Sequence, residues 1–320
     1  MTVTSVTARV PAKINLQLAV GPLRPDGYHG LVTVFHAVSL FDEVTVVAAK
    51  ADGVTVAGEG AGHVPADGDN LALRAVRALR EAIAARDGAP PDAGPDARPG
   101  VAVAIRKRIP VAGGLAGGSA DAAAALVACN ALWQTELSQQ ELCEGAARVG
   151  SDVAFAVVGG TAVGRGRGEQ LTSALVAPVS YHWVLAFAEG HLSTPAVYGT
   201  LDRQRAGNDV AEPEPSAQLL AALRSGAPEL VGAALSNDLQ APAVSMYPAL
   251  RKTLAAGIES GALGGLVSGS GPTCFFLARD ERHATDISVA LSGAGVCRSV
   301  AKATGAVPGA SLVARLSLAN

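Results

Sequence analysis

A glycine-rich segment is the first part of the sequence suited to chemistry. It reads PVAGGLAGGSAD over residues 110–121 and lies between an expected strand and an expected helix. Glycine has no Cβ atom, so an anion can approach the backbone N–H groups, and a helix start adds partial positive charge. We place that helix start at Ser119 and predict that the segment binds phosphate groups.

The spacing of these glycines excludes two better-known phosphate loops. Ser119 stands where a Walker loop would have lysine after its last glycine. The glycines also do not fit G-x-G-x-x-G, and no acidic residue follows at a suitable distance, which argues against a nicotinamide-binding oxidoreductase. Taken alone, a glycine-rich turn more often reflects tight packing.

Two further groups could complete a catalytic site. Lys13 and Asn15 share one face of a strand expected over residues 3–20, opposite the apolar residues at positions 14, 16, 18 and 20. Asp152 follows a helix that begins with an S-x-x-E capping box at Ser138 and ends near Gly150. We therefore expect Asp152 on a connector, free to face a cleft.

Together these groups fit phosphoryl transfer. That reaction needs positioning of the triphosphate, neutralisation of its charge, and a carboxylate that orients or deprotonates the attacking hydroxyl. The sequence therefore predicts an ATP-dependent kinase that acts on a hydroxyl of a small metabolite.

The elements that must hold these groups are both helical and extended, so the expected fold class is α+β. Asn70 is expected to cap a helix that runs to about Arg86. The stretches at 89–100 and 204–216 are rich in proline and polar residues and are expected to be surface loops. Further strands are expected at 32–38, 44–48, 101–105, 182–188, 264–268 and 273–278, and helices at 119–133 and 280–291.

Length and composition exclude several classes of protein. A chain of 320 residues with 49% hydrophobic and 17% charged residues is typical of a globular protein of roughly two domains. A net charge of −3 offers no basic surface for nucleic acid, and no apolar run reaches the length that a membrane span needs. We expect a cytoplasmic protein without nucleic-acid or membrane partners, and either a monomer or a weak homodimer.

The cysteines carry no sign of a disulfide framework or a metal site. Cys129, Cys143, Cys274 and Cys297 are far apart and form no C-x-x-C pair. We interpret them as reduced core thiols.

Three motifs together resemble the GHMP kinase superfamily and occur in its order along the chain. They are PAKIN at 11–15, the glycine loop PVAGGLAGGSADAAA from Pro110, and GSGP at 269–272. RPDGYH at 24–29, GSDVAF at 150–155 and GGTAVGRGRGE at 159–169 resemble, more narrowly, a member that phosphorylates a cytidyl diphosphate sugar alcohol. The resemblance covers nearly the whole chain and is weakest near Pro91 and Val210.

The resemblance implies a two-domain α+β fold with the active site between the domains. Residues 1–170 would form a ribosomal-protein-like N-terminal domain that binds ATP with Mg²⁺, and residues 171–320 a ferredoxin-like C-terminal domain that binds the substrate. The residues implied to bind ATP are Pro110, Val111, Ala112, Gly113, Gly114, Leu115, Ala116, Gly117, Gly118, Ser119, Ala120, Asn70 and Lys107.

The resemblance also implies roles for residues outside the loop. Asp152 would be the catalytic base, with Lys13 beside it to help place the acceptor hydroxyl. Tyr28, His29 and Tyr198 would hold the cytosine, by stacking and hydrogen bonding. The residues implied to bind the acceptor are Asn15, Tyr28, His29, Tyr198, Gly269 and Ser270.

Several alternatives stay open at this stage. Asn70 can be a plain helix cap, and Lys107 a solvated surface charge. Gly118 stands before Ser119 where many members have a second serine, so the sequence does not identify the magnesium ligands. The chain could instead act on mevalonate, homoserine or a sugar, or be an inactive relative, although inactive relatives need not keep Lys13 and Asp152.

Overall fold

The computed structural model describes residues 2–88 and 98–318. Residues 89–97 of the expected surface loop lie outside the described residues. The other expected loop, 204–216, includes the end of a helix and an irregular connection, and Gln17 holds the end of that connection. Its side chain donates to the Glu214 carbonyl oxygen over 2.9 Å and accepts from the Ser216 backbone N–H over 2.8 Å.

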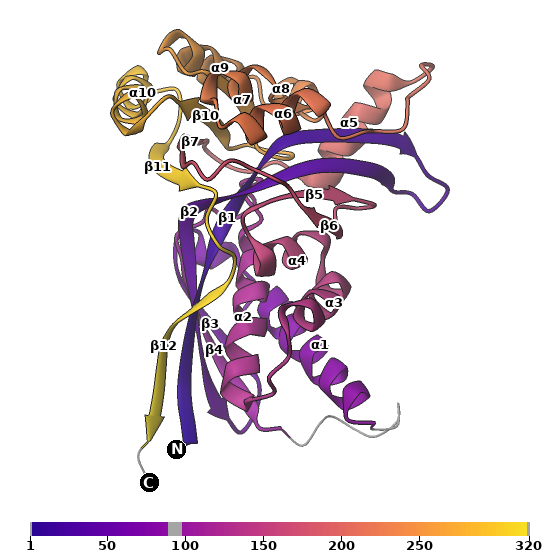
Figure 1. Cartoon of the computed structure of the whole chain (residues 1–320), viewed down its shortest axis with the longest axis vertical. Coiled ribbons are helices and arrows are strands. Elements are labelled where there is room, and N and C mark those ends of the chain that lie inside the picture. The colour runs from indigo at the N-terminus through magenta and orange to yellow at the C-terminus, as the bar shows by residue number, and fades with distance from the viewer. Residues whose placement is uncertain (1, 89–97, 319–320) are drawn as a thin grey trace.

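One sheet of twelve strands extends through the described chain (Figure 1). Two long antiparallel strands, β1 and β2, form its backbone, and its main path runs β12-β1-β2-β11-β7-β10-β9. The strands are β1 (Thr2–Leu23), β2 (His29–Ala49), β3 (Gly53–Gly58), β4 (Gly100–Lys107), β5 (Thr161–Arg165), β6 (Gln170–Ser173), β7 (Tyr181–Phe187), β8 (Ser236–Asn237), β9 (Gly264–Val267), β10 (Cys274–Ala278), β11 (Ser299–Gly305) and β12 (Ser311–Leu318).

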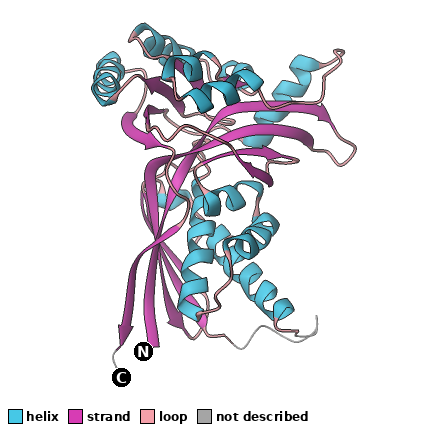
Figure 2. Ribbon diagram, viewed as in Figure 1, coloured by secondary structure: helices cyan, strands magenta, loops and turns pink. Residues whose placement is uncertain are grey.

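The helices form two groups at opposite ends of the molecule (Figure 2). The first group, α1 to α4, packs against the part of the sheet that holds both termini, and α6 to α10 gather at the other end. The helices are α1 (Leu71–Arg86), α2 (Gly117–Trp133), α3 (Gln139–Val149), α4 (Ser151–Val158), α5 (Thr194–Arg205), α6 (Ala217–Ser225), α7 (Pro228–Ala233), α8 (Gln240–Met246), α9 (Ala249–Glu259) and α10 (Glu281–Ala294), with a 3₁₀ turn, η1, at Ala61–His63.

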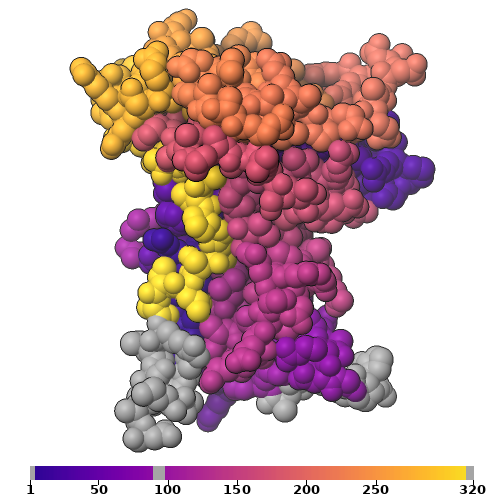
Figure 3. All heavy atoms as spheres, viewed as in Figure 1, coloured from indigo at the N-terminus to yellow at the C-terminus, as the bar shows by residue number. Residues whose placement is uncertain are grey.

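The two larger apolar cores follow these groups only in part, because the first core also takes in Leu219 of α6 and Val231 of α7. Along β1, Ile14 and Leu16 belong to the first core, whereas Leu18 and Val20 belong to the second. One strand therefore stabilises both halves, and the C-terminal strand β12 returns to pair with the start of β1 (Figure 3, yellow). The domain boundary between residues 170 and 171 stays a prediction.

Most expected elements are present, with two local differences. The Asn70 side chain caps α1, and Ser138 and Glu141 form the complete capping box of α3. However, α2 begins at Gly117, two residues before the expected start at Ser119, because Ala116 takes the left-handed cap conformation (φ 57°). The four cysteines are free thiols, with Cys129 and Cys274 buried and the other two half-buried.

Helix α9 packs so closely on β10 that a side chain at Gly257 would collide with Phe276. We expect Gly257→Ala to lower the free energy of unfolding by about 1–3 kcal/mol, because overpacking outweighs the helix propensity of alanine. Urea denaturation measures the change. Gly145→Ala in α3 is the matched control, since no atom lies within 4 Å of its new Cβ. An equal effect of both substitutions would contradict the predicted collision.

Candidate active site

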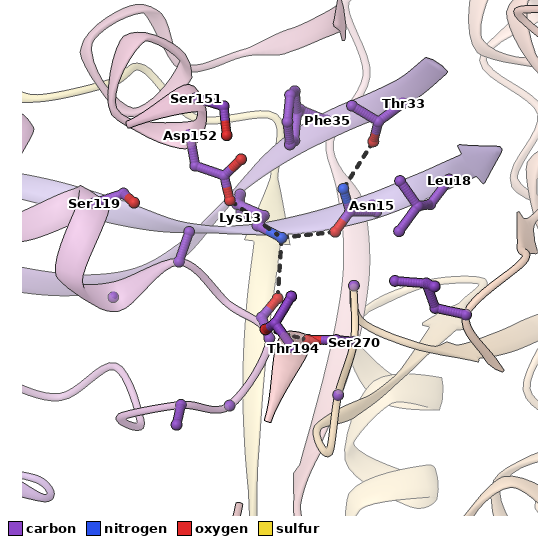
Figure 4. A pocket seen from close by; sticks show the side chains of 18 of the residues that line it. Lys13, Asn15, Leu18, Thr33, Phe35, Ser119, Ser151, Asp152, Thr194 and Ser270 are labelled. Atoms are coloured by element: carbon purple, nitrogen blue, oxygen red, sulfur yellow. Dashed lines mark hydrogen bonds and ion pairs between the residues drawn. The ribbon is translucent and has the colours of Figure 1, made fainter. Parts of the chain in front are cut away.

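A cleft of about 500 Å³ lies where β1, β2, the glycine loop, α4, α5 and the 269–272 turn meet (Figure 4). Lys13, Asn15, Asp152 and Ser270 all line it, although they come from three distant parts of the chain. The structure therefore brings the predicted catalytic pair into one cavity with the glycine loop.

Lys13 is held at the centre of this cleft. Its Nζ atom donates to Asn15 Oδ1 over 2.7 Å and to the Gly114 carbonyl oxygen over 3.1 Å, and it lies 3.7 Å from Asp152 Oδ2. The side chain is 9% exposed. Burial lowers the pKa of Lys13 below its ordinary value, and the negative charge of Asp152 partly opposes that shift.

Asn15 is fixed from its other side by β2. Its Nδ2 atom donates to Thr33 Oγ1 over 2.7 Å, and the Thr33 hydroxyl donates in turn to the Gln17 carbonyl oxygen over 2.8 Å. Because Nδ2 is the donor to Thr33, the Asn15 oxygen faces the ammonium of Lys13. The alternation predicted for β1 thus orients both polar groups.

Asp152 does not lie on a connector, which corrects the prediction. It lies in the first turn of α4, whose N-cap is Gly150. A carboxylate is favourable in the first turn of a helix because the N-terminus carries partial positive charge. Phe155 of the same helix stacks on Phe35 of β2, with ring centroids 4.8 Å apart, and this contact sets the position of α4 beside Lys13.

The glycine loop connects β4 to α2 through left-handed residues. Ala112, Gly114 and Ala116 have φ angles of 52°, 78° and 57°. A side chain at Gly114 would collide with the Ser268 carbonyl oxygen, so only glycine fits there. No side chain caps α2, and its first intrahelical bond runs from the Ala120 N–H to the Ala116 carbonyl oxygen. The N–H groups at the start of α2 are therefore unused by the helix itself.

The predicted loop residues divide into three sets. Leu115 and Ala120 are buried in the core, and Pro110 and Val111 line a neighbouring hollow of about 460 Å³. The residues that line the cleft are Ala112, Gly113, Gly114, Ala116, Gly117, Gly118 and Ser119.

The turn at 269–272 closes the cleft from the C-terminal half. Asn237 Nδ2 donates to the carbonyl oxygen of Gly269 over 2.8 Å. The hydroxyls of Ser270 and Thr194 are 2.8 Å apart, which ties the turn to the start of α5. Both predicted residues of this turn line the cleft.

Another hollow, of about 440 Å³, opens beside the cleft and contains the predicted aromatic residues. His29 stacks on Tyr198 with ring centroids 5.5 Å apart, and Arg167 lies 3.7 Å from the ring centroid of Tyr28. Burial raises the pKa of the Tyr198 hydroxyl, with a smaller contribution from nearby Asp152. We call this hollow the aromatic pocket.

Asn70 and Lys107 line neither the cleft nor the aromatic pocket. They line a separate hollow, of about 260 Å³, on the far side of the loop residues Ala112 and Gly118. Asn70 accepts from the Ala72 N–H over 2.9 Å and donates to the Pro65 carbonyl oxygen over 2.7 Å, so the helix-cap interpretation is confirmed. Lys107 is buried and is not a solvated charge.

Comparison with known proteins identifies the family. Residues 70–160 match the GHMP kinases N terminal domain, and residues 219–297 match the GHMP kinases C terminal domain. A 4-diphosphocytidyl-2-C-methyl-D-erythritol kinase of Mycolicibacterium smegmatis is 54% identical over 98% of this chain and 94% of its own length. One of Salinispora tropica is 53% identical over 96% and 94%.

The chain belongs to the 4-diphosphocytidyl-2-C-methyl-D-erythritol kinase family. A crystal structure with that name superposes with a TM-score of 0.71 at 33% identity, covering 93% of this chain and 98% of the other. A homoserine kinase of Cytophaga hutchinsonii, at 18% identity and a TM-score of 0.70, shares the fold. The predicted superfamily and its two-domain α+β fold are confirmed.

This kinase has a buried charge cluster that our sequence prediction missed. Lys107 Nζ lies 2.5 Å from Asp42 Oδ2 and 2.7 Å from Asp121 Oδ2, and all three side chains are at most 3% exposed. Asp42 also accepts from the backbone N–H groups of Arg108 and Ile109. The sequence signal for this cluster was Asp42 itself, a charged residue within an apolar strand segment. A buried aspartate needs a partner, so its position implied a buried cation or hydrogen-bond donor nearby.

Two carboxylates share one ammonium in this cluster, so one of them is favoured in its protonated form. Burial raises the pKa of Asp121 to about 8, against the opposing pull of Lys107. Asp121 Oδ1 has no hydrogen-bond partner, whereas both oxygens of Asp42 are bonded. The proton therefore belongs on Asp121.

Two oxygen-bearing side chains of the cleft fit a magnesium ion that arrives with the nucleotide. Within residues 2–88 and 98–318, no group of three or more His, Cys, Asp or Glu side chains could hold a metal ion. Mg²⁺ commonly uses one or two protein oxygens together with water and phosphate oxygens. The Ser119 hydroxyl and the Asp152 carboxylate line the cleft and offer such oxygens. No helix in the described ranges has the length and apolar character to cross a membrane.

The buried cluster predicts a pH dependence of stability. The pKa of Asp121 is about 8 in the folded state against 3.8 ordinarily, so folding takes up a proton between these values. The free energy of unfolding should fall as pH rises from 4 toward 8, because the unfolded state then loses the proton that the folded state keeps. Asp121→Asn should lack that part of the slope, measured by urea denaturation at several pH values. Asp69→Asn, an exposed residue of the same hollow, is the control. Parallel slopes for wild type and Asp121→Asn would show that Asp121 does not titrate in this way.

Proposed function

We propose that this kinase transfers the γ-phosphoryl group of ATP to the 2-hydroxyl of 4-diphosphocytidyl-2-C-methyl-D-erythritol, a step of the non-mevalonate isoprenoid precursor pathway. The observation that carries the proposal is the Lys13–Asp152 pair, with 3.7 Å between Nζ and Oδ2, beside a helix N-terminus that no side chain caps. Relatives more than 50% identical over nearly the whole chain support the choice of substrate.

The triphosphate would bind along the loop from Ala112 to Ser119. Backbone N–H groups at the start of α2 would donate to phosphate oxygens, and the helix dipole favours their negative charge. The adjoining hollow, which Asn70 and Lys107 line, would receive the nucleoside end of ATP. Ser119 would hold Mg²⁺ together with phosphate oxygens, and the ion would neutralise charge on the triphosphate.

The acceptor would extend from the cleft into the aromatic pocket. Asn15 would contact the methylerythritol end, and Gly269 and Ser270 would bound it from the C-terminal half. Tyr28, His29 and Tyr198 would hold the cytosine. Both cavities share Thr194 and Tyr198 in their walls, so one elongated ligand can occupy both.

The transfer step then needs few groups. The acceptor oxygen attacks the γ-phosphorus, the bond from that phosphorus to the ADP oxygen breaks, and the hydroxyl proton passes to Asp152. Lys13 would hold the acceptor oxygen and neutralise charge between the reactants. Cytoplasmic location and a monomeric or weakly dimeric state stay predictions from the sequence.

Asp152→Asn should abolish transfer while both substrates still bind. The carboxylate acts mainly in the transition state, so kcat should fall by about 10²–10⁴-fold while the dissociation constants change by less than about threefold. An ADP-release assay and calorimetric titration measure the two effects. Asp286→Asn, an exposed carboxylate in α10, is the control. Near-normal turnover by Asp152→Asn would remove the proposed base.

A substrate panel tests the acceptor. Offered beside mevalonate, homoserine and galactose, the cytidyl acceptor should be preferred by about 10³-fold or more in kcat/KM, because the other molecules leave the aromatic pocket empty. The measurement is ADP release for each acceptor at matched concentrations. Preference for an acceptor without a cytidyl group would overturn the assignment.

A further inference from the structure

The aromatic pocket contains a carboxylate that the proposed function does not use. Asp202 of α5 lines this pocket, and its Oδ1 atom lies 3.2 Å from His29 Nε2. Its side chain is 38% exposed, so a ligand can reach it. In the part of the chain that the structure describes, Asp202 has no lysine or arginine within salt-bridge distance, unlike Asp238, which pairs with Arg205 over 2.8 Å.

The face of α5 that carries Asp202 also forms a wall of the cleft. Thr194, Tyr198 and Asp202 are spaced four residues apart and therefore lie on one side of the helix. Thr194 contacts Ser270 at the cleft, Tyr198 stacks on His29, and Asp202 faces His29. One helix face thus continues from the phosphoryl-transfer site into the aromatic pocket.

The hydrogen-bonding role of His29 follows from its neighbours. Its Nδ1 atom lies 2.9 Å from the Gly21 carbonyl oxygen, which only accepts, so Nδ1 carries a hydrogen and donates it. Its ring is 8% exposed and stacked on Tyr198, so its orientation is held. Nε2 is the ring nitrogen that faces Asp202.

We propose that Asp202 is a specificity-determining residue that distinguishes cytosine from uracil; the inference rests on the proposed function. A carboxylate accepts hydrogen bonds. Cytosine presents an exocyclic amino group, a donor, which matches the carboxylate of Asp202 in this pocket.

Uracil reverses this contact. It presents a carbonyl oxygen where cytosine has the amino group. The carbonyl oxygen would face the carboxylate of Asp202, so that two acceptors meet. A mismatch of this kind discriminates through repulsion as well as lost attraction.

The test compares the cytidyl acceptor with its uridyl counterpart in wild type and Asp202→Asn. Wild type should prefer the cytidyl form by at least about 10²-fold in kcat/KM. An amide can accept or donate, so in Asp202→Asn this ratio should fall by at least about tenfold, mainly through KM. The KM for ATP should stay at its wild-type value.

Two further variants sharpen the outcome. Asp202→Ala should weaken use of the cytidyl form and, because the repulsion is removed, should not weaken use of the uridyl form. Asp209→Asn, an exposed carboxylate in the connection after the same helix, should leave the ratio at its wild-type value. Equal thermal stability and ATP binding of all variants would show that they are folded.

The outcomes distinguish failure of the proposed function from failure of the role inferred for Asp202. A wild type that does not phosphorylate the cytidyl acceptor refutes the proposed function and the inference with it. A wild type that uses the cytidyl acceptor, together with an Asp202→Asn ratio within about twofold of wild type, refutes the role of Asp202 alone. A wild type that uses both acceptors equally also refutes that role.

Discussion

The carbonyl oxygen of Gly114 is the point on which the active site depends. It accepts from Lys13 Nζ over 3.1 Å and from the Ser268 hydroxyl over 2.9 Å, so it joins β1, the glycine loop and the turn after β9. The positive φ of Gly114 turns this oxygen toward both donors, and a side chain there would strike the Ser268 carbonyl oxygen. The loop that would bind phosphate and the lysine beside the proposed base are therefore positioned by one group.

The two buried lysines near this loop have opposite electrostatic environments. Burial disfavours the charge of Lys107, yet two carboxylates outweigh burial and raise its pKa. The ion pair with Asp121 joins β4 to α2 beneath the loop. Lys13 has one carboxylate at 3.7 Å, and burial outweighs it, so its pKa is lowered. Lys107 is suited to a structural role, whereas Lys13 retains the capacity to respond to a ligand's charge.

Local sequence patterns predicted a large part of this architecture. The alternation in β1, the Asn70 cap of α1 and the capping box at Ser138 depend on residues a few positions apart, and all three are present. The prediction for Asp152 was wrong because a glycine at position 150 can end one helix and begin the next. Asp42 and Asp202 were missed because their partners are 65 and 173 residues away, and no local pattern reports such contacts.

The sequence alone determined the family, the α+β class and the residue types available for chemistry, since motifs and periodicity are properties of neighbouring positions. Only the tertiary structure decided that Lys13 meets Asp152 and Gly114, that Lys107 is enclosed by two carboxylates, and that Asp202 faces His29. The physical reason is that these contacts depend on the register of β1 against β2 and on how the helices pack on the sheet. Both are set by the summed burial of many distant side chains.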